Sequence, residues 1–498
     1  MNWLFLNVSL EHQPEQVKEL TKNFKLHQEQ LCDGSKCDII YDPRLTLGKP
    51  VAHGNRSKLL IAGWFLLEGT VNNYNRLLER IEQNGLSEAL FSIEQGVFIG
   101  IFDDGVTPHV FVDWFGLSAH YLTRVGGQLQ VAPSALALRS ELTPINPVHL
   151  GIIEKKGHIW GHRTRYQNIE RILPGHINSL DKQKCYIDFS RIPAVPIAEI
   201  PLHIKKTTDA FDSTSKFVSI SAGFDSRLLA IIGNASRGYT WGPEQSKDIM
   251  NSGVIAKKLQ LKVHHFRFKE EQPNADDDVI CEWILAGQNK QLQQQFFVNY
   301  RKASQLCKPA FVALDGYLGD VLQRGVYLYG SSLRSEIKRL FPGCFTRDAD
   351  IQILRERYCK LSDKELKLLE HDYTELLEKI NLTGVDRANY VTAFEFMFGR
   401  GFAHIYMGGI ALNSVFNVVL PGFAERRIFT ACLRSPVEEV LKYQVFKNTW
   451  LLLDSDIVRL KSEGLYSPKT SQLFIPFANF IGRVITNYLP KYKNYGKE

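Results

Sequence analysis

The sequence predicts a mixed protein in which an α+β half, built mainly of strands, precedes an α/β half with a parallel sheet and a helical end. Three observations support this fold class. Short apolar runs separated by turn residues recur up to about residue 190. Strand-like and helix-like segments alternate from about residue 205. Prolines are dense in residues 191–201, which indicates a linker between two domains, at 1–190 and 205–498.

The first half is expected to be a layered α+β domain. Its clearest apolar runs are Leu59–Phe65, Val97–Phe102 and His109–Val112, and turns such as Asp103–Gly105 separate them. A helix is expected over Asn73–Gln83.

The second half is expected to fold as a doubly wound parallel sheet. Strands are expected over Lys216–Ile220, Gly238–Trp241, Val263–Phe268 and Phe311–Leu314, and helices over Arg227–Ile232 and Ser246–Leu259. Such sheets bind ligands beyond the carboxyl ends of their strands. Residues from about 335 onward are expected to be predominantly helical.

Composition and charge exclude several classes of protein. Hydrophobic residues make up 44% and charged residues 23% of the 498, as in ordinary globular proteins. The net charge of +7 is mild and spread widely, which does not favour nucleic-acid binding. The eight cysteines have irregular spacings, so neither a zinc site nor a disulfide framework is expected. No signal peptide or bilayer-spanning run is evident, which predicts a cytoplasmic protein without a membrane partner.

The most informative segment is the small-residue turn that follows the first expected strand of the second half. It contains Ser219, Ser221, Gly223, Asp225 and Ser226. A strand, a small-residue turn and a helix together present backbone N–H groups to an anion. Asp225 adds a carboxylate suited to a phosphate-bound Mg²⁺. We therefore expect a cradle for pyrophosphate, and ATP cleaved between its α and β phosphates. A plain tight turn is the alternative, and a Walker-type phosphate loop is excluded because GxxxxGK[ST] is absent.

Two later segments add candidate ligands. The strand ending at Trp241 is placed to hold adenosine, although an ordinary βαβ unit explains most of its residues. The turn at Gly316, Tyr317 and Asp320 follows another expected strand. Asp320 is expected to supply a second carboxylate for Mg²⁺, opposite Asp225, and Tyr317 is expected to meet a substrate amine. A surface Asx turn is the alternative for this segment.

A lysine near the C-terminus completes the set. Lys461 precedes a loop rich in Gly, Ser and Pro, which would fold back over the site. Its ammonium would stabilise the extra negative charge on a pentacoordinate α-phosphorus. A solvated surface lysine is the alternative, and Lys447 is a weaker candidate.

In their order along the chain, these segments resemble the asparagine synthetase family, which includes β-lactam synthetases and lasso-peptide cyclases. The family's SGGxDS loop falls on Ser221–Ser226, its GExGxDE-like loop on Gly316–Asp320 and its late lysine on Lys461. Degenerate forms of the family's N-terminal elements fall on Gly96–Asp103 and Val131–Leu138. The resemblance implies an Ntn-hydrolase-like sandwich of the class II glutamine amidotransferase type, followed by a PP-loop ATP pyrophosphatase domain.

The sequence departs from the family at informative positions. Glutamine-dependent members use a cysteine at the second position of the chain as nucleophile. The residue here is Asn2, so no glutaminase activity is expected. Tyr317 stands where most members have glutamate, which is similar to β-lactam synthetases, whose tyrosine works with a glutamate on a later helix. Glu395 is the candidate for that glutamate, and an exposed helix residue is the alternative. Val321 and Val419 replace an acidic residue and an arginine of the family pattern.

The resemblance implies an ATP-dependent carbon–nitrogen ligase. It would adenylate a carboxylate with Mg-ATP, release pyrophosphate and pass the acyl group to an amine. The expected partners are small-molecule or peptide acids and amines, with a homo-oligomer or a biosynthetic partner enzyme also open. Ammonia supplied from elsewhere, for example for uronic acid or amino-acid amidation, is an alternative. Two further alternatives are a different enzyme of the ATP pyrophosphatase superfamily and a non-catalytic binding or scaffold protein that descends from a synthetase.

Overall fold

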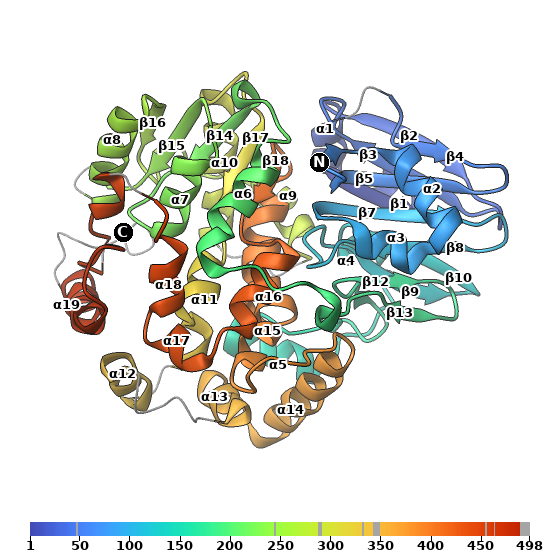
Figure 1. The fold of residues 1–498 in the computed structure, drawn as a ribbon. Coiled ribbons are helices and arrows are strands. Elements are labelled where there is room, and N and C mark those ends of the chain that lie inside the picture. Colours follow the sequence, from blue (N-terminus) through green and yellow to red (C-terminus); the bar gives the residue numbers. More distant parts are fainter. Residues whose placement is uncertain are drawn as a thin grey trace.

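The protein is described by a computed structural model covering residues 1–45, 48–243, 246–286, 291–330, 333–341, 349–453, 456–462 and 464–488. Within these residues the fold is mixed α/β. Two antiparallel sheets come from residues 2–185, and one parallel sheet comes from residues 216–421. Figure 1 shows the antiparallel sheets, in blue to cyan, beside the parallel sheet with its helices.

The antiparallel sheets contain six and seven strands. The first has the order β11 (Glu170–Arg171), β9 (Tyr121–Val125), β10 (Gln128–Ala132), β1 (Asn2–Leu6), β3 (Lys36–Tyr41) and β2 (Lys25–Gln30). The second has the order β13 (Gln183–Cys185), β12 (His176–Asn178), β8 (Pro108–Val112), β7 (Gln95–Asp103), β5 (Lys58–Leu67) and β4 (Val51–His53), with β6 (Thr70–Val71) paired to β5.

The two antiparallel sheets pack face to face. Leu4 of β1 and Ile39 of β3 share one buried cluster with Leu60 of β5 and Ile99 of β7. Alternate residues of each strand point into this core, as the period of a strand requires. The outer face of the second sheet is covered by α2 (Tyr74–Asn84) and α3 (Leu86–Ser92), both part of a second buried cluster. The expected α+β layering is therefore present.

The parallel sheet has five strands, in the order β16 (Lys262–Phe266), β15 (Arg237–Trp241), β14 (Lys216–Ser219), β17 (Val312–Asp315) and β18 (Val418–Pro421). All four pairings are parallel. The chain moves from β14 to β15 on one side and places β17 on the other, so the strand order reverses between β14 and β17. Such a switch point opens a crevice at the carboxyl ends of the two strands.

Helices cover both faces of the parallel sheet. Phe217 of β14 packs with Ala303 of α10 (Gln291–Leu306) and with Cys307, which follows that helix, on one face. Its neighbour Val218 packs with Leu229 of α7 (Phe224–Ile232) on the other. This arrangement explains why β14 is apolar on both sides, as strands of covered parallel sheets are.

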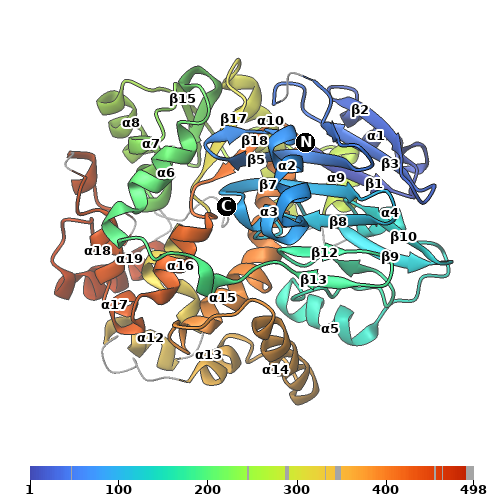
Figure 2. The ribbon, with the colours of Figure 1, turned by 45° about the vertical axis from the view of Figure 1, so that its right-hand side comes forward.

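The two halves share contacts across their boundary. The indole N–H of Trp64 donates to the Val419 carbonyl at 3.0 Å, and the Gln95 amide donates to the Pro421 carbonyl at 2.7 Å. Trp3 packs on Trp283 of α9 (Ala275–Ile284), with ring centroids 4.9 Å apart. The edge strand β18 is therefore held against the antiparallel half, and Figure 2 shows the same adjacency from a second direction.

The remaining helices complete the two halves. They are α1 (Glu15–Thr21), α4 (Ala135–Leu138), α5 (Pro147–Lys156), α6 (Ile200–Thr208), α8 (Lys247–Leu259), α11 (Gly319–Arg324), α12 (Leu333–Leu340), α13 (Asp350–Arg357), α14 (Asp363–Glu378), α15 (Asn389–Met397), a π-helix (Gly401–Ala411), α16 (Arg426–Arg434), α17 (Val437–Leu441), α18 (Gln444–Thr449) and α19 (Ile475–Tyr488). The C-terminal part is mostly helical, as expected.

Two local expectations differ from the structure. Pro201, assigned to the linker, lies in the first turn of α6, where a missing N–H removes no helical hydrogen bond. The strand β18 interrupts the segment expected to be helical, because Val418, Val419 and Leu420 fill a buried edge of the parallel sheet. Within the described residues, no helix combines the length and apolar character needed to cross a bilayer.

Candidate functional site

The loop after β14 is tied together by two serines. The Ser221 backbone N–H donates to the Ser226 hydroxyl at 3.1 Å, and the two hydroxyls lie 2.8 Å apart. The Gly223 N–H donates to the Ser221 hydroxyl at 3.1 Å. Gly223 is also the N-cap of α7 and offers no side chain to cap it. The first turn of α7, which contains Asp225 and Ser226, therefore leaves backbone donors for another acceptor.

The loop after β17 meets this turn at close range. A Cβ on Gly316 would lie 2.8 Å from the Ser226 backbone nitrogen, and a Cβ on Gly319 would lie 2.5 Å from the Asp225 carboxyl carbon. At Gly316 the added Cβ would meet backbone atoms, so the backbone would have to shift, whereas at Gly319 it would meet side chains. Gly316 is thus the glycine that the contact between the two loops requires, and these loops are about ninety residues apart in the sequence.

The contact brings two carboxylates to one cation. Arg324 Nη2 lies 3.6 Å from an Asp225 oxygen and 3.9 Å from an Asp320 oxygen. The Gln323 amide donates to Asp225 at 3.2 Å. The two acids were expected to face each other, and in the structure a single guanidinium nitrogen lies near both. Arg324 was not anticipated, although its i,i+4 spacing from Asp320 on a helix was a visible signal.

Burial changes the acidity of this site. It raises the pKa of Asp225 to about 7, against the opposing effect of Arg324, and the nearby Asp320 raises it further. Burial likewise raises the pKa of Asp315, at the end of β17, to about 7. These carboxyl groups are poorly stabilised as anions in the protein alone, so a ligand cation would be favoured here.

A cavity of about 470 Å³ opens at these strand ends. Its volume is typical of small-molecule sites. Nine residues anticipated from the sequence line it: Ser219, Ser221, Gly223, Asp225, Ser226, Trp241, Gly316, Tyr317 and Asp320. Sequence reasoning missed several others: Tyr239, Asp248, Tyr300, Asp315, Arg324 and Arg400.

One wall of the cavity is aromatic. The Trp241 ring centroid lies 5.1 Å from that of Tyr239 and 5.6 Å from that of Tyr300. Acidic, basic and hydroxyl side chains line the side of the cavity formed by the two loops. The cavity therefore has an aromatic wall beside a polar one. This division suits a ligand with a flat ring and an anionic chain.

Asp248 supports the loop from the neighbouring helix. Its carboxylate accepts the Ala222 N–H at 2.6 Å, and it lies in the first turn of α8. The Arg227 guanidinium donates to the Ala222 carbonyl at 2.9 Å. Both backbone groups of Ala222 are therefore held by side chains, which fixes the loop.

Tyr317 has a different partner from the one expected. Its hydroxyl contacts the Tyr300 hydroxyl in the cavity wall. Burial, then Tyr300 and Asp315, raise the pKa of Tyr317 well above its ordinary value. The phenol is thus less readily ionised than a free tyrosine and is set to donate a hydrogen bond. Its expected part in deprotonating an amine remains a prediction.

Glu395 lies outside this cavity. It is fully buried in α15, where Arg357 donates to it at 2.6 Å and the Arg400 backbone N–H at 2.8 Å. The structure therefore pairs Glu395 with Arg357 and does not pair it with Tyr317. The alternative of an exposed helix residue is also ruled out by its burial.

Lys461 lies beside the loop helices but is exposed and does not line the cavity. Its backbone is anchored, because Asn251 of α8 donates to the Lys461 carbonyl at 3.0 Å and Arg227 donates to the Leu460 carbonyl. The segment is thus bound to the same helices that carry the loop. The weaker candidate Lys447 donates instead to the Thr470 carbonyl at 2.8 Å.

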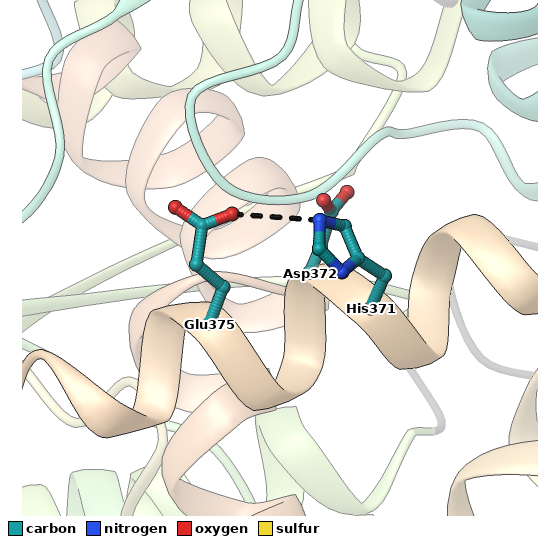
Figure 3. Close-up of side chains that lie close together, drawn as sticks. All are labelled: His371, Asp372 and Glu375. Atoms are coloured by element: carbon teal, nitrogen blue, oxygen red, sulfur yellow. Dashed lines mark ion pairs between the residues drawn. The ribbon is translucent and has the colours of Figure 1, made fainter.

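A three-residue cluster on α14 does not form an open metal site. His371, Asp372 and Glu375 lie within reach of one another, as Figure 3 shows. Arg163 donates to both oxygens of the buried Asp372, at 2.6 and 2.8 Å, and the Trp160 indole donates at 2.7 Å. The buried member of the cluster is therefore already neutralised and hydrogen-bonded.

The N-terminal half shows no activated thiol among its described residues. Asn2 donates from its amide to the Ser118 hydroxyl at 2.8 Å. Burial, then Asp103, raise the pKa of Cys32 to about 11, and burial raises that of Cys37 further. Burial also raises the pKa of Cys185 to about 11, so a thiolate nucleophile is disfavoured at all three cysteines of this half.

Comparison with known proteins adds no assignment. The chain matches no family model, and no curated protein resembles it at a significant level.

Proposed function

We propose that the protein is an ATP-dependent amide synthetase that activates a carboxylate by adenylation, releases pyrophosphate and transfers the acyl group to an amine. The observation that carries this proposal is the meeting of two strand-end loops at the switch point of the parallel sheet. There Asp225, from the first turn of α7, and Asp320, from α11, share one cation beside a small-residue anion loop.

The residues fit the magnesium that such a reaction requires. Asp225 and Asp320 offer carboxylate oxygens, which Mg²⁺ prefers. The raised pKa of Asp225 marks a carboxylate that gains stability from an added cation. When bound, Mg²⁺ would neutralise charge on the phosphates.

The remaining residues have complementary roles in the proposal. The first turn of α7, with Ser221 and Ser226, holds the pyrophosphate leaving group. The aromatic wall at Trp241 accommodates the adenine ring. Arg324 retains its positive charge next to the acids and balances the phosphates. Lys461, anchored through its backbone, moves its ammonium over the α-phosphate when substrates bind.

This function is consistent with a sandwich of the glutamine amidotransferase type at 1–190 that has lost its activity, and with a PP-loop domain at 205–498. Asn2 and the raised pKa of Cys32 support the absence of a glutaminase. The amine is then a second substrate or ammonia from a separate source. We place the reaction in the cytoplasm, with small-molecule or peptide substrates and without nucleic acid.

The direct test is pyrophosphate release from Mg-ATP, screened against carboxylic acids with and without amines. The proposal predicts pyrophosphate only when a suitable acid is present, AMP as the nucleotide product, and loss of both in Asp320→Asn. Formation of ADP and phosphate would contradict it. ATP binding without turnover across a broad acid panel would instead favour the non-catalytic scaffold protein.

A further inference from the structure

A second cavity, of about 440 Å³, adjoins the strand-end cavity. Val326, Tyr327 and Arg400 line both cavities. The second cavity, which we call the cationic cavity, is lined by residues of α5, α13 and α15 among others, and these helices lie in the lower part of Figure 1.

The charges in the cationic cavity are strongly one-sided. Six of its described lining residues are lysine or arginine and only Glu395 is acidic. These cations are Lys155, Lys156, Arg339, Arg357, Lys360 and Arg400. Glu395 is already paired with Arg357, and Lys155 is paired with Glu365 at 2.7 Å. The balance of the lining is therefore positive.

Three of the cations are available to a ligand. In the part of the chain that the structure describes, Lys156, Lys360 and Arg400 form no ion pair with a carboxylate, although Glu395 acts on Lys156 from a greater distance. The half-buried Lys156 ammonium donates to the Arg357 carbonyl at 2.8 Å and lies 4.7 Å from the Tyr358 ring centroid. Burial lowers the pKa of Lys156 and the charge of Glu395 raises it, and the direct contacts of the ammonium are with these neutral groups. Clustered cations at a concave surface attract anions and repel ammonium groups.

The floor of the cavity offers flat surfaces between the charges. Tyr327, Tyr329 and Tyr358 line it. The Arg357 guanidinium lies 4.7 Å from the Tyr327 ring centroid and Arg339 lies 4.9 Å from that of Tyr329. Such stacking keeps guanidinium groups in fixed orientations, which favours planar recognition of a carboxylate or phosphate.

We propose that the cationic cavity selects the acid substrate, and that this acid is a polyanion. The inference rests on the synthetase function proposed above. The reacting carboxylate enters the strand-end cavity, and a second anionic group, carboxylate or phosphate, binds among Lys156, Lys360 and Arg400. The amine enters elsewhere, because the cations would repel it in its ammonium form.

The test is a binding measurement on the full chain without ATP, by titration calorimetry at fixed ionic strength. The probes are two matched pairs: succinate against butyrate, and glucuronic acid 1-phosphate against glucuronic acid. The first pair tests a second carboxylate and the second pair a phosphate. The inference predicts that succinate, glucuronic acid 1-phosphate or both bind about tenfold or more tightly than their monoanionic partners. Equal affinities within both pairs would overturn it.

Charge reversal locates the binding. Lys360→Glu changes an exposed side chain of the cavity, and Lys364→Glu is a matched control on an exposed residue of α14 outside it. Lys360→Glu should weaken the preferred dianion about tenfold or more and leave Mg-ATP affinity within about twofold. The control should change neither. Equal effects of the two variants would overturn the inference, as would an equal loss of Mg-ATP affinity, which would assign the cavity to the triphosphate.

The two proposals fail in different ways. If dianions bind selectively but no acid elicits pyrophosphate, the synthetase function fails and the anion site stands. If pyrophosphate is released equally well with monoacids and diacids, the synthetase stands and the polyanion specificity is wrong.

Discussion

Two aspartates with little exposed surface, one in each half of the molecule, have opposite surroundings. Asp113 lies in the antiparallel half and accepts backbone N–H donors from Phe98, Phe115, Leu117 and Ser118, at 3.0 to 3.3 Å. Burial raises its pKa to about 6, and these donors lower it. Its carboxylate oxygens are thus directed at the protein's own backbone.

The carboxylate of Asp225, in the parallel half, accepts fewer hydrogen bonds from the protein than that of Asp113. It accepts a side-chain hydrogen bond from Gln323 at 3.2 Å and one backbone hydrogen bond from Asp320, and its arginine neighbour stays 3.6 Å away. It also faces a cavity. The hydrogen bonds of Asp113 fix a turn, and we propose that Asp225, at the cavity, is instead available to a ligand.

The sharpest way to break this comparison is to replace both acids by amides. Asp225→Asn should lower pyrophosphate release at least about a thousandfold, because the proposed magnesium site would lose a ligand. Its folding should be intact. Asp113→Asn should instead lose about 1 to 3 kcal/mol of stability, because an amide cannot accept from all four donors. Steady-state rates and thermal unfolding measured on both variants check this, and equal activity losses would refute the distinction.

Lys461→Ala tests whether the exposed lysine acts only during turnover. The rate should fall about a hundredfold or more, while Mg-ATP affinity stays unchanged, because the ammonium stabilises the transition state alone. Lys469→Ala, an exposed lysine of the same segment, is the control and should be neutral. Unchanged turnover in Lys461→Ala would show that Lys461 is a surface residue.

The raised pKa of Asp225 provides a third test, because it makes the stability of the protein depend on pH. Because the pKa of Asp225 is raised to about 7 in the folded protein, its contribution to stability is complete below about pH 4 and is lost as pH rises to 7. The loss should be on the order of a few kcal/mol. Asp225→Asn should remove it, so the variant should exceed wild type in stability at pH 8. If the free energy of unfolding changed by the same amount in both proteins between pH 5 and 8, this expectation would be wrong.

The approach of the two loops provides a fourth test. Gly316→Ala forces the Asp225–Ser226 backbone to shift and should destabilise the protein by about 1 to 3 kcal/mol, with loss of activity. Gly253→Ala lies in α8 with no atom within 4 Å of the added Cβ, and it should stabilise slightly. Denaturant unfolding of the two alanine variants measures both effects. An equal change in the free energy of unfolding would mean that the contact between the two loops does not require glycine at residue 316.

The smallest expected effect concerns the antiparallel half. Added glutamine should give no glutamate above background, whatever other substrates are present, because Asn2 is not a nucleophile and the pKa of Cys32 is about 11. A coupled glutamate assay checks this. Glutamate formation that follows enzyme concentration would show that the half is catalytically active.

The strands β14 to β17 and the helices α7 and α8 of the parallel half could be predicted because each turn between them carries its own signal, whereas the strand β18 was not predicted. Ser221, Gly223 and Gly316 are small residues at strand ends, and the structure places them in one cavity. Partners from distant segments could not be predicted in the same way. The Asp248 contact with Ala222 and the burial of Glu395 against Arg357 depend on helix packing, which single-segment patterns do not contain.

We propose that ATP breaks between its α and β phosphates in the cavity at Asp225 and Asp320. Exchange of labelled pyrophosphate into ATP measures this directly, in the presence of Mg²⁺ and an acid that elicits pyrophosphate release, without an amine. The account predicts acid-dependent exchange in the wild type and none in Asp225→Asn or Asp320→Asn. Turnover of ATP to ADP without exchange, or exchange that survives both substitutions, would contradict it.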